Sequence, residues 1–278
     1  MNFFERQLVG KLKNGEQESF TILFEQYNKK IYNLAFRMCG NKEDADDIVQ
    51  KTFIQAFRNI NNFKEESGIY TWLYTIAKNL CLRLLEKKKK STFSSLDELV
   101  HIVQSQENQD DFTVVEKQYY INQVKDGCLL GLLRCLSFYQ RIAFILNVLL
   151  DVKAKDIAVI VNKSETSTRL LIHRARQNIR SFPCKNCSFY NHDNFCHCEN
   201  LINFSLKQGW IQKIYNKKSI LRLDITPLEI EKEIDDLKKI TLLYSSIEDQ
   251  KPSEKIIHFI QEEISKQTYK IFYYKKVK

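Results

Sequence analysis

Residues 41–90 read NKEDADDIVQKTFIQAFRNINNFKEESGIYTWLYTIAKNLCLRLLEKKKK. The stretch opens with acidic residues and continues as a helix whose apolar and aromatic residues recur with the helical period. After a short polar loop, a second helix carries Tyr70, Trp72 and Tyr74 and ends in lysines 87–90. The sequence therefore predicts a pair of helices with two surfaces of different chemistry, one acidic and one both aromatic and basic.

The acidic surface lies at the start of the first helix. Gly40 and Asn41 end the preceding helix, and the Asn41 side chain can cap the next one. Acidic residues suit the opening turns because the helix dipole favours negative charge there. Carboxylates three or four residues apart share a face and can meet basic residues of a partner, although a plain charge bias on a surface helix explains the same pattern. These acidic residues are Glu43, Asp44, Asp46 and Asp47.

Apolar periodicity joins residues 16–90 into one helical unit. An amphipathic stripe runs along residues 16–40 and is expected to pack on the apolar side of the helix that follows. The stripe consists of Phe20, Leu23, Phe24, Tyr27, Ile31, Leu34 and Ala35, and the facing residues are Ile48, Val49, Phe53 and Phe57.

A second helical unit is expected at residues 117–182, after a polar and net acidic linker at 91–116 that has low intrinsic order. The unit ends in a helix-turn-helix pattern, in which Asn162-Lys163 forms the turn and Ser164 caps the second helix, residues 165–179. We expect Pro183 to end that helix. By spacing, its inner face holds Thr168, Ile172, Ala175 and Ile179, and its outer stripe holds Arg169, His173 and Arg176.

Residues 183–278 read as a small, mostly helical C-terminal extension. Thr226–Glu229 is a capping-box start with proline at the first helical position. A further helix opens at Pro252-Ser253 and carries an isoleucine stripe, and the tail at 268–277 looks extended. The stripe consists of Ile256, Ile257, Ile260 and Ile264.

Composition fits a mainly all-α protein. Only 7 glycines and 3 prolines interrupt 278 residues, and alternating β patterns are scarce. There are 43 Lys+Arg against 34 Asp+Glu, a formal charge of +9 that favours polyanions such as nucleic acid, or that reflects solvated lysine-rich faces. The sequence contains no apolar run of membrane-spanning length and no signal-peptide core, so we expect a cytoplasmic protein without membrane attachment.

Eight cysteines are present, and the cytoplasm would keep them reduced. Four of them lie in apolar helical patterns and are expected to be small core residues: Cys39, Cys81, Cys128 and Cys135. The other four, Cys184, Cys187, Cys196 and Cys198, fall within fifteen residues that also contain His192 and His197. This spacing favours a structural zinc site, with a redox-active disulfide and a loop of unrelated thiols as alternatives. No other cofactor is expected.

The motifs described so far resemble a known family. Residues 44–53, DADDIVQKTF, and 70–79, YTWLYTIAKN, are similar to the second conserved region of bacterial RNA polymerase sigma factors of the sigma-70 family, extracytoplasmic-function group. The helix-turn-helix ending in residues 172–176, IHRAR, resembles the fourth region of that group. The order of the two motifs and the spacing between them also match the family, and together they cover roughly residues 16–182.

The resemblance implies a protein that is not an enzyme and that directs RNA polymerase to promoters. Residues 1–90 would bind the clamp helices of the largest polymerase subunit and would melt the −10 element. The contacts with polymerase would come from Asp44, Asp47, Gln50 and Phe53. Aromatic faces and cations are the groups that hold unstacked single strands. The −10 contacts would come from Lys64, Ser67, Tyr70, Trp72, Lys78, Asn79, Arg83 and Lys87.

The resemblance assigns residues 117–182 to the −35 element and to the flap of the second-largest polymerase subunit. The start of the second helix would read bases, and later basic residues would contact phosphates. These residues are Glu165, Thr166, Ser167, Arg169, His173, Arg174 and Arg176. Leu170 and Leu171 stand where the family often has serine and arginine, so we expect weak −35 reading and a second protein that helps to place the complex.

Residues 183–278 are interpreted as a regulatory extension that could bind an anti-sigma factor or another protein; a stabilising cap is the alternative. Two different functions compete with the sigma-factor interpretation. One is a stand-alone helix-turn-helix regulator that binds duplex DNA without polymerase. The other is a metal- or redox-responsive regulator that acts through the four clustered cysteines.

Overall fold

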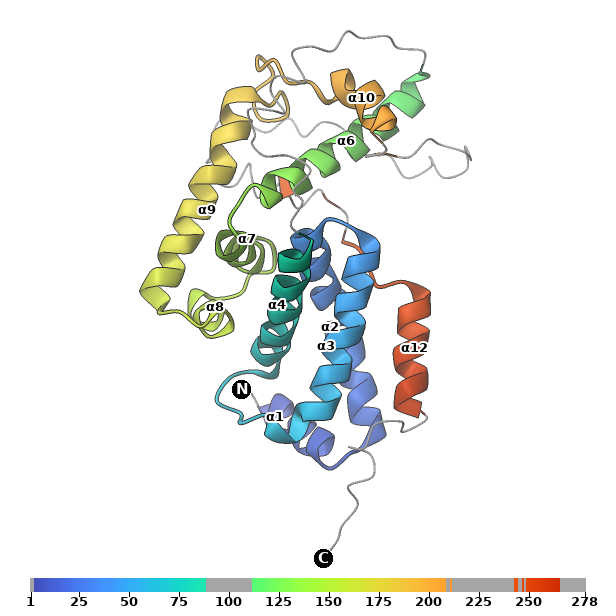
Figure 1. Ribbon diagram of the computed structural model, residues 1–278, viewed down its shortest axis with the longest axis vertical. Coiled ribbons are helices and arrows are strands. Elements are labelled where there is room, and N and C mark those ends of the chain that lie inside the picture. Colours follow the sequence, from blue (N-terminus) through green and yellow to red (C-terminus); the bar gives the residue numbers. More distant parts are fainter. Residues whose placement is uncertain are drawn as a thin grey trace, which may run out of the picture. The chain divides into compact units, whose positions relative to one another are not determined.

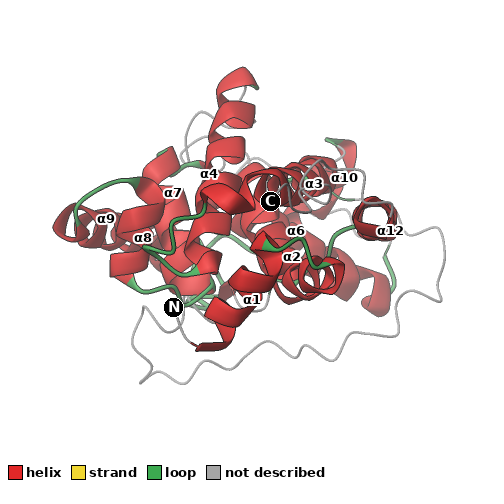
Figure 2. Ribbon diagram, turned by 90° about the horizontal axis from the view of Figure 1, so that it is seen from below, coloured by secondary structure: helices red, strands yellow, loops and turns green. Residues whose placement is uncertain are grey.

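The computed structural model describes residues 3–88, 112–208, 211, 243–244, 247 and 249–265. Within these residues the regular structure is helical and contains no strand, apart from one isolated bridge between Cys187 and Cys196 (Figure 2). The all-α prediction is therefore confirmed. No helix in the described part of the chain is long and apolar enough to cross a membrane.

The described residues group into two compact units. Unit 1 takes its residues from 1–89, 138–172 and 248–278, and unit 2 takes them from 90–137 and 173–247. Residues 91–111 of the predicted linker (91–116), the predicted capping box at 226–229 and the predicted extended tail at 268–277 lie outside the described residues. The end of the linker prediction is wrong, because α6 already begins at Val114.

Unit 1 is built on four helices from the N-terminal part of the chain, α1 (Phe3–Lys13), α2 (Gln17–Cys39), α3 (Lys42–Asn59) and α4 (Ile69–Lys87) (Figure 1). Helix α2 ends at Gly40, whose φ of 82° is the left-handed value that favours glycine. Edge-to-face aromatic pairs join α2 to α3, with ring centroids 4.8 Å apart for Phe20–Phe57 and 4.9 Å for Phe24–Phe53.

Unit 1 also contains the first part of the helix-turn-helix region. Helix α7 (Phe138–Phe144) continues as a π-helical turn, Ile145–Leu149, and α8 (Ala154–Val161) follows. Arg141 of α7 donates to the carbonyl of Met38 over 2.8 Å. Helix α8 packs on α4, where the Tyr70 hydroxyl donates to Asp156 over 2.6 Å.

Helix α12 (Glu254–Ser265) completes unit 1. Ser253 caps it by accepting a hydrogen bond from the Ile256 amide, as the sequence predicted. The isoleucine stripe is confirmed in its second half, since Ile260 and Ile264 are each 1% exposed, whereas Ile256 and Ile257 are partly buried. The helix packs against α2 and α3 (Figure 1).

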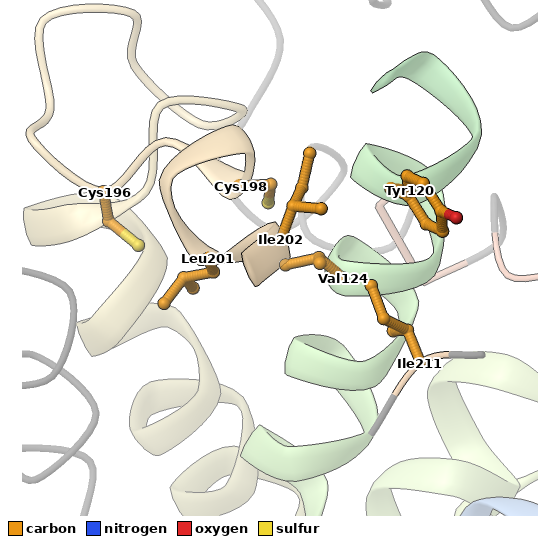
Figure 3. Packing of buried hydrophobic residues seen from close by; sticks show 7 residues of the cluster. All are labelled: Tyr120, Val124, Cys196, Cys198, Leu201, Ile202 and Ile211. Atoms are coloured by element: carbon orange, nitrogen blue, oxygen red, sulfur yellow. The ribbon is translucent and has the colours of Figure 1, made fainter. Parts of the chain in front are cut away.

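Unit 2 contains α6 (Val114–Arg134), the later part of α9 (Glu165–Asn186) and α10 (Ile202–Lys207). Thr113 and Glu116 form a capping box at the start of α6. An apolar cluster packs α6 against the segment around α10, and it consists of Tyr120, Val124, Cys196, Cys198, Leu201, Ile202 and Ile211 (Figure 3).

Helix α9 corrects one prediction. It continues through Pro183 to Asn186 instead of ending before the proline. A proline removes one backbone donor and usually breaks a helix in its interior. Here only three residues follow it, and the side chains of Phe182 and Pro183 are buried. The packing of these two side chains holds the last turn in helical form.

Candidate functional site

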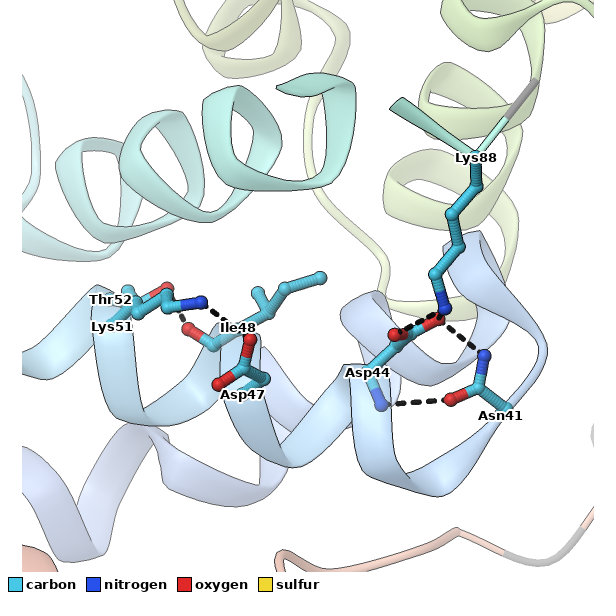
Figure 4. A network of polar contacts seen from close by, with 7 residues as sticks. All are labelled: Asn41, Asp44, Asp47, Ile48, Lys51, Thr52 and Lys88. Atoms are coloured by element: carbon cyan, nitrogen blue, oxygen red, sulfur yellow. Dashed lines mark hydrogen bonds and ion pairs between the residues drawn. The ribbon is translucent and has the colours of Figure 1, made fainter. Parts of the chain in front are cut away.

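The acidic surface of α3 is arranged around its cap. The Asn41 side chain accepts from the Asp44 amide over 2.8 Å and donates to the Asp44 carboxylate (Figure 4). The Lys88 ammonium bonds both oxygens of the same carboxylate, at 2.7 Å and 2.6 Å. This hydrogen bond raises the pKa of Lys88. Asp44 is therefore already held by two neighbours, and its side chain is only 13% exposed.

The next turn of α3 carries a second internal pair. Asp47 forms an ion pair with Lys51 four residues later, and both side chains are about half exposed. Such a pair is worth roughly 0.3–0.5 kcal/mol and opens at little cost. Gln50 is partly exposed. Asp47 and Gln50 are therefore the accessible members of the predicted polymerase-binding set.

Phe53 was expected to anchor that surface, and this assignment is wrong. Its side chain is 0% exposed and packs edge-to-face on Phe24 in the core of unit 1. The helical period explains the error: Phe53 is four residues from Val49, which is also 0% exposed, so both point inward. Phe53 supports the α3 surface from below.

The loop before α4 has a defined shape. It begins with the 3-10 turn Ile60–Asn62, and Phe63 is buried behind it. Glu65 has a left-handed φ of 61° and bonds Lys13 over 2.7 Å. The predicted DNA contacts Lys64 and Ser67 are exposed and partly exposed, respectively. The loop thus presents its polar residues outward while Phe63 fixes its base.

One side of α4 carries most of the predicted −10 residues. Trp72, Asn79 and Arg83 are separated by seven and four residues, so they lie along one stripe, and Lys87 continues it. Asn79, Arg83 and Lys87 are exposed. Trp72 is partly exposed, and its ring lies on that of Phe63 with centroids 5.1 Å apart. The stripe therefore offers an aromatic face, an amide and two cations together.

Tyr70 and Lys78 do not belong to this stripe. Tyr70 lies on another side of α4, where its hydroxyl is bonded to Asp156 of α8. Burial and this hydrogen bond raise its pKa to about 12. Lys78 is only 8% exposed, and burial lowers its pKa. Neither side chain is presented with the exposed DNA-binding candidates.

The turn of the helix-turn-helix depends on Asn162. This residue takes the left-handed conformation, with φ 55° and ψ 56°, at the end of α8. Asparagine tolerates that region better than most residues because its side chain can bond locally. Ser164 then caps α9 by accepting from the Ser167 amide over 3.1 Å. The predicted inner face of α9 is confirmed, since Thr168, Ile172, Ala175 and Ile179 are all buried.

The predicted base-reading residues of α9 are exposed but pair with one another. Arg169 bonds the Glu165 carboxylate through Nη2 at 2.5 Å and Nε at 3.1 Å. Thr166 and Ser167 are exposed. Leu170, the residue after Arg169, is 46% exposed, and Val159 of α8 is 56% exposed. This surface therefore combines few free polar groups with exposed apolar area.

The later predicted contacts of α9 lie in unit 2. His173 and Arg174 are exposed, whereas Arg176 is partly buried. His173 and Arg174 are thus the more accessible of these three residues, and an Arg176 contact with phosphate requires its guanidinium to turn outward.

The four clustered cysteines are held by a compact loop in unit 2. Cys187 and Cys196 form a backbone bridge, and the Asn194 side chain donates to the carbonyls of Pro183, Cys184 and Cys187. Burial raises the pKa of the Cys196 thiol to about 12 and also that of Cys198. Within the described residues, no group of three or more His, Cys, Asp or Glu side chains could hold a metal ion.

The other cysteines only partly match their predicted core positions. Cys39 and Cys81 are buried, Cys128 is partly buried, and Cys135 is exposed. Burial raises the pKa of the Cys128 thiol. The prediction is confirmed for the first two and wrong for Cys135, which follows the last residue of α6.

The sequence patterns did not point to two residues that shape the site. Lys88 neutralises Asp44, and its place in the lysine run 87–90 gave no sign of a specific partner. Gly68 lies under the Tyr70 ring, and a Cβ atom there would approach two ring carbons to 2.7 Å and 2.9 Å. A glycine directly before an aromatic helix start was the available signal for such a close approach.

These features define a helical protein that carries both an aromatic, basic helix and a helix-turn-helix. Residues 23–91 match the model of sigma-70 region 2, and residues 126–179 match sigma-70 region 4. The chain is a member of the sigma-70 family, in the extracytoplasmic-function group.

Three relatives illustrate the similarity. SigW of Bacillus subtilis, an ECF RNA polymerase sigma factor, is 39% identical over 89 residues, which are 32% of this chain and 48% of SigW. This chain thus spans about half the length of that relative. RNA polymerase sigma factor YlaC of B. subtilis is 28% identical over 59% of this chain and 91% of YlaC. The ECF sigma factor SigE of Mycolicibacterium smegmatis is 28% identical over 61% and 63%, respectively.

Among solved structures, CnrH in complex with the cytosolic domain of CnrY is 19% identical, covers 64% of this chain and 95% of that chain, and has a TM-score of 0.47. The sigma factor RpoE with the anti-sigma factor NepR from Bartonella quintana is 20% identical over 59% and 96%, with a TM-score of 0.43.

Proposed function

We propose that this protein binds core RNA polymerase, brings it to promoters and helps to open the −10 region. The observation that carries the proposal is the presence of sigma-70 regions 2 and 4 in one chain, in that order. The relatives SigW, YlaC and SigE are named as RNA polymerase sigma factors. The chain itself performs no catalysis in this proposal, because polymerase supplies the chemistry.

Polymerase binding is assigned to the exposed part of α3. Asp47 and Gln50 are the accessible residues, and Asp47 can exchange Lys51 for a basic group of the clamp helices. Asp44 is less accessible because Asn41 and Lys88 hold it. Charge contacts of this kind mainly accelerate association and weaken with salt.

Opening of the −10 element is assigned to the stripe on α4. The Trp72 ring supplies a face for an unstacked base, and Arg83 and Lys87 supply charge for the phosphates. Stacking of a base on an aromatic side chain is worth about 1–3 kcal/mol. That amount is comparable with the few kcal/mol needed to move a base out of a duplex.

Run-off transcription with core polymerase on genomic fragments tests the proposal. We expect defined start sites that require this protein and that disappear with Asn79→Ala/Arg83→Ala, while binding to core polymerase is retained. Arg6→Ala/Gln7→Ala, which removes one guanidinium and one amide at exposed positions of α1, is the matched control. Absence of core binding and of defined start sites would contradict the proposal and favour a stand-alone DNA-binding regulator.

A second proposal concerns placement on the promoter. Arg169 is engaged by Glu165, and Leu170 of α9 and Val159 of α8 are exposed apolar side chains. We therefore expect weak dependence on the −35 sequence and a contribution from another protein that contacts the apolar residues. Strong initiation by purified holoenzyme that is lost when only the −35 element is changed would overturn this proposal.

A further inference from the structure

The segment from Asp249 to Ser265 is held on α2 by a specific set of polar contacts. The Asn33 side chain pairs with the backbone of Gln250 in both directions, donating to its carbonyl over 2.9 Å and accepting from its amide over 3.1 Å. Asn33 itself is only 2% exposed. A buried amide that is satisfied by the backbone of one distant segment indicates a defined binding position for that segment.

A buried charge makes the same connection. Arg37 of α2 has a side chain only 4% exposed, and Asp249 accepts from its Nη2 over 3.3 Å. Burial lowers the pKa of Arg37, and Asp249 opposes this effect. Lys29 adds a longer ion pair with Asp249 at 3.9 Å. Loss of Asp249 would leave the largely buried guanidinium without this carboxylate, so the segment contributes to the stability of α2.

Apolar contacts and a cap extend the binding to α3. The Ser253 amide at the start of α12 donates to Asp46 Oδ1 over 2.8 Å. Ile260 and Ile264, one turn apart, are each 1% exposed where α12 packs on α2 and α3 (Figure 1). Burial of these two apolar side chains favours the packed position of α12.

The position of this contact on α3 matters for function. Asp46 directly precedes Asp47, and it lies one turn before Gln50 on the same side of the helix. Asp47 and Gln50 are the accessible residues of the polymerase-binding surface. If a pair of helices bound to these residues, it would therefore also contact the segment from Asp249 to Ser265.

We propose that the segment Asp249–Ser265 is an intramolecular clasp, which occupies the edge of the polymerase-binding surface of α3 and competes with core polymerase for it. The clasp rests on the proposed function, because it assumes that α3 receives polymerase. Only those molecules in which the segment is open can bind polymerase. The apparent Kd is then the intrinsic Kd divided by that open fraction.

The test compares three full-length proteins by titrating core RNA polymerase into labelled protein and following fluorescence anisotropy. Ile260→Glu/Ile264→Glu places charges in the buried face of α12 and should release it. Lys255→Gln/Gln261→Glu makes the same change in net charge at two exposed positions of the same helix. We expect binding at least about five-fold tighter for the first variant, corresponding to a closed fraction of about 80% or more, and no change for the second.

The outcomes separate the two proposals. Binding of core by all three proteins with equal Kd, or weaker binding by the released variant, overturns the clasp and leaves the proposed function intact. No core binding by any of them contradicts the proposed function. If circular dichroism shows that the released variant is unfolded, Asp249→Asn replaces it, since it removes only the ion pairs with Arg37 and Lys29. Asp249→Asn should also lower the Kd for core polymerase, by a smaller factor. An unchanged Kd overturns the clasp.

Discussion

Tyr70 of α4 donates a 2.6 Å hydrogen bond to Asp156 of α8, a residue 86 positions later in the chain. An aromatic side chain that the sequence assigned to DNA is thus held by the first helix of the helix-turn-helix. Burial, the hydrogen bond to Asp156 and nearby charges raise the pKa of Tyr70 to about 12. A DNA contact made through the Tyr70 hydroxyl would have to replace this bond.

The first prediction measures that bond. Tyr70→Phe removes the hydroxyl, and we expect it to lower the free energy of unfolding by about 1–2 kcal/mol, as for a partly buried hydrogen bond to a carboxylate. Asp156→Asn should cost less, because an amide oxygen still accepts. Urea denaturation of both variants and of the double variant gives the coupling energy. Additive effects of the two changes would show that the bond contributes nothing.

The second prediction concerns alkaline pH. The pKa values of Tyr27, Tyr32 and Tyr70 are raised to about 12 in the folded protein, mainly by burial. Their ordinary value is 10.0, so the unfolded chain releases these protons first. The stability from the neutral tyrosines is therefore complete below pH 10 and is lost as the pH rises toward 12.

Urea denaturation between pH 9 and 12 should show this loss, and Tyr70→Phe should show a smaller dependence on pH. The part of the tyrosinate absorbance that comes from Tyr27, Tyr32 and Tyr70, obtained by comparison with the Tyr→Phe variants, should rise together with unfolding. A stability that stays constant up to pH 12 would contradict the assignment of these pKa shifts.

The third prediction concerns Gly68. Gly68→Ala places a methyl group 2.7 Å from the Tyr70 ring, so the ring has to move away and its bond to Asp156 is strained. We expect a loss of about 1–3 kcal/mol, as for overpacking. Gly127→Ala and Gly131→Ala in α6 are matched controls, because a Cβ atom there meets nothing within 4 Å. These two changes should stabilise the protein by about 0.5–1 kcal/mol.

Thermal unfolding of the three variants tests both signs. Equal effects of Gly68→Ala and Gly131→Ala would show that the close approach to Tyr70 is relieved without cost.

The fourth prediction tests the zinc hypothesis for Cys184, Cys187, Cys196 and Cys198. Thiols bind zinc as thiolates, whereas burial raises the pKa of Cys196 and Cys198. Metal binding would require these thiols to release protons, and also to rearrange, because no group of them within the described residues is placed to hold a metal ion. The hypothesis predicts near-stoichiometric zinc or iron in protein purified without chelator, and its loss in Cys187→Ser/Cys196→Ser. Elemental analysis that finds no such metal rejects it.

Local patterns predicted the helices and their buried faces well. Val49, Phe57, Ile172 and Ala175 are buried as their spacing indicated, because a helical period fixes which side chains share a face. The same period that made Phe53 a core residue was overridden by the family resemblance, and that choice was wrong. Pro183 was a local signal that tertiary packing overcame.

Long-range partners could not be predicted in this way. The isoleucine stripe of α12 indicated an apolar face but carried no information about which surface would cover it. The contacts of Lys88 with Asp44 and of Tyr70 with Asp156 join residues 44 and 86 positions apart. Such pairs depend on how helices are placed in space, and neither charge nor spacing within one helix specifies that placement.

The pairing of Asn33 with Gln250 spans 217 positions, and this separation determines when the clasp can form during protein synthesis. Helices α1 to α4 are complete when a ribosome has translated residue 88, and roughly 160 further residues precede Asp249. At about 5–20 residues per second, this interval lasts roughly 10–30 s. If the proposed clasp exists, α3 of a nascent chain is uncovered during that time, and a newly synthesised molecule would be open to polymerase before α12 has been made.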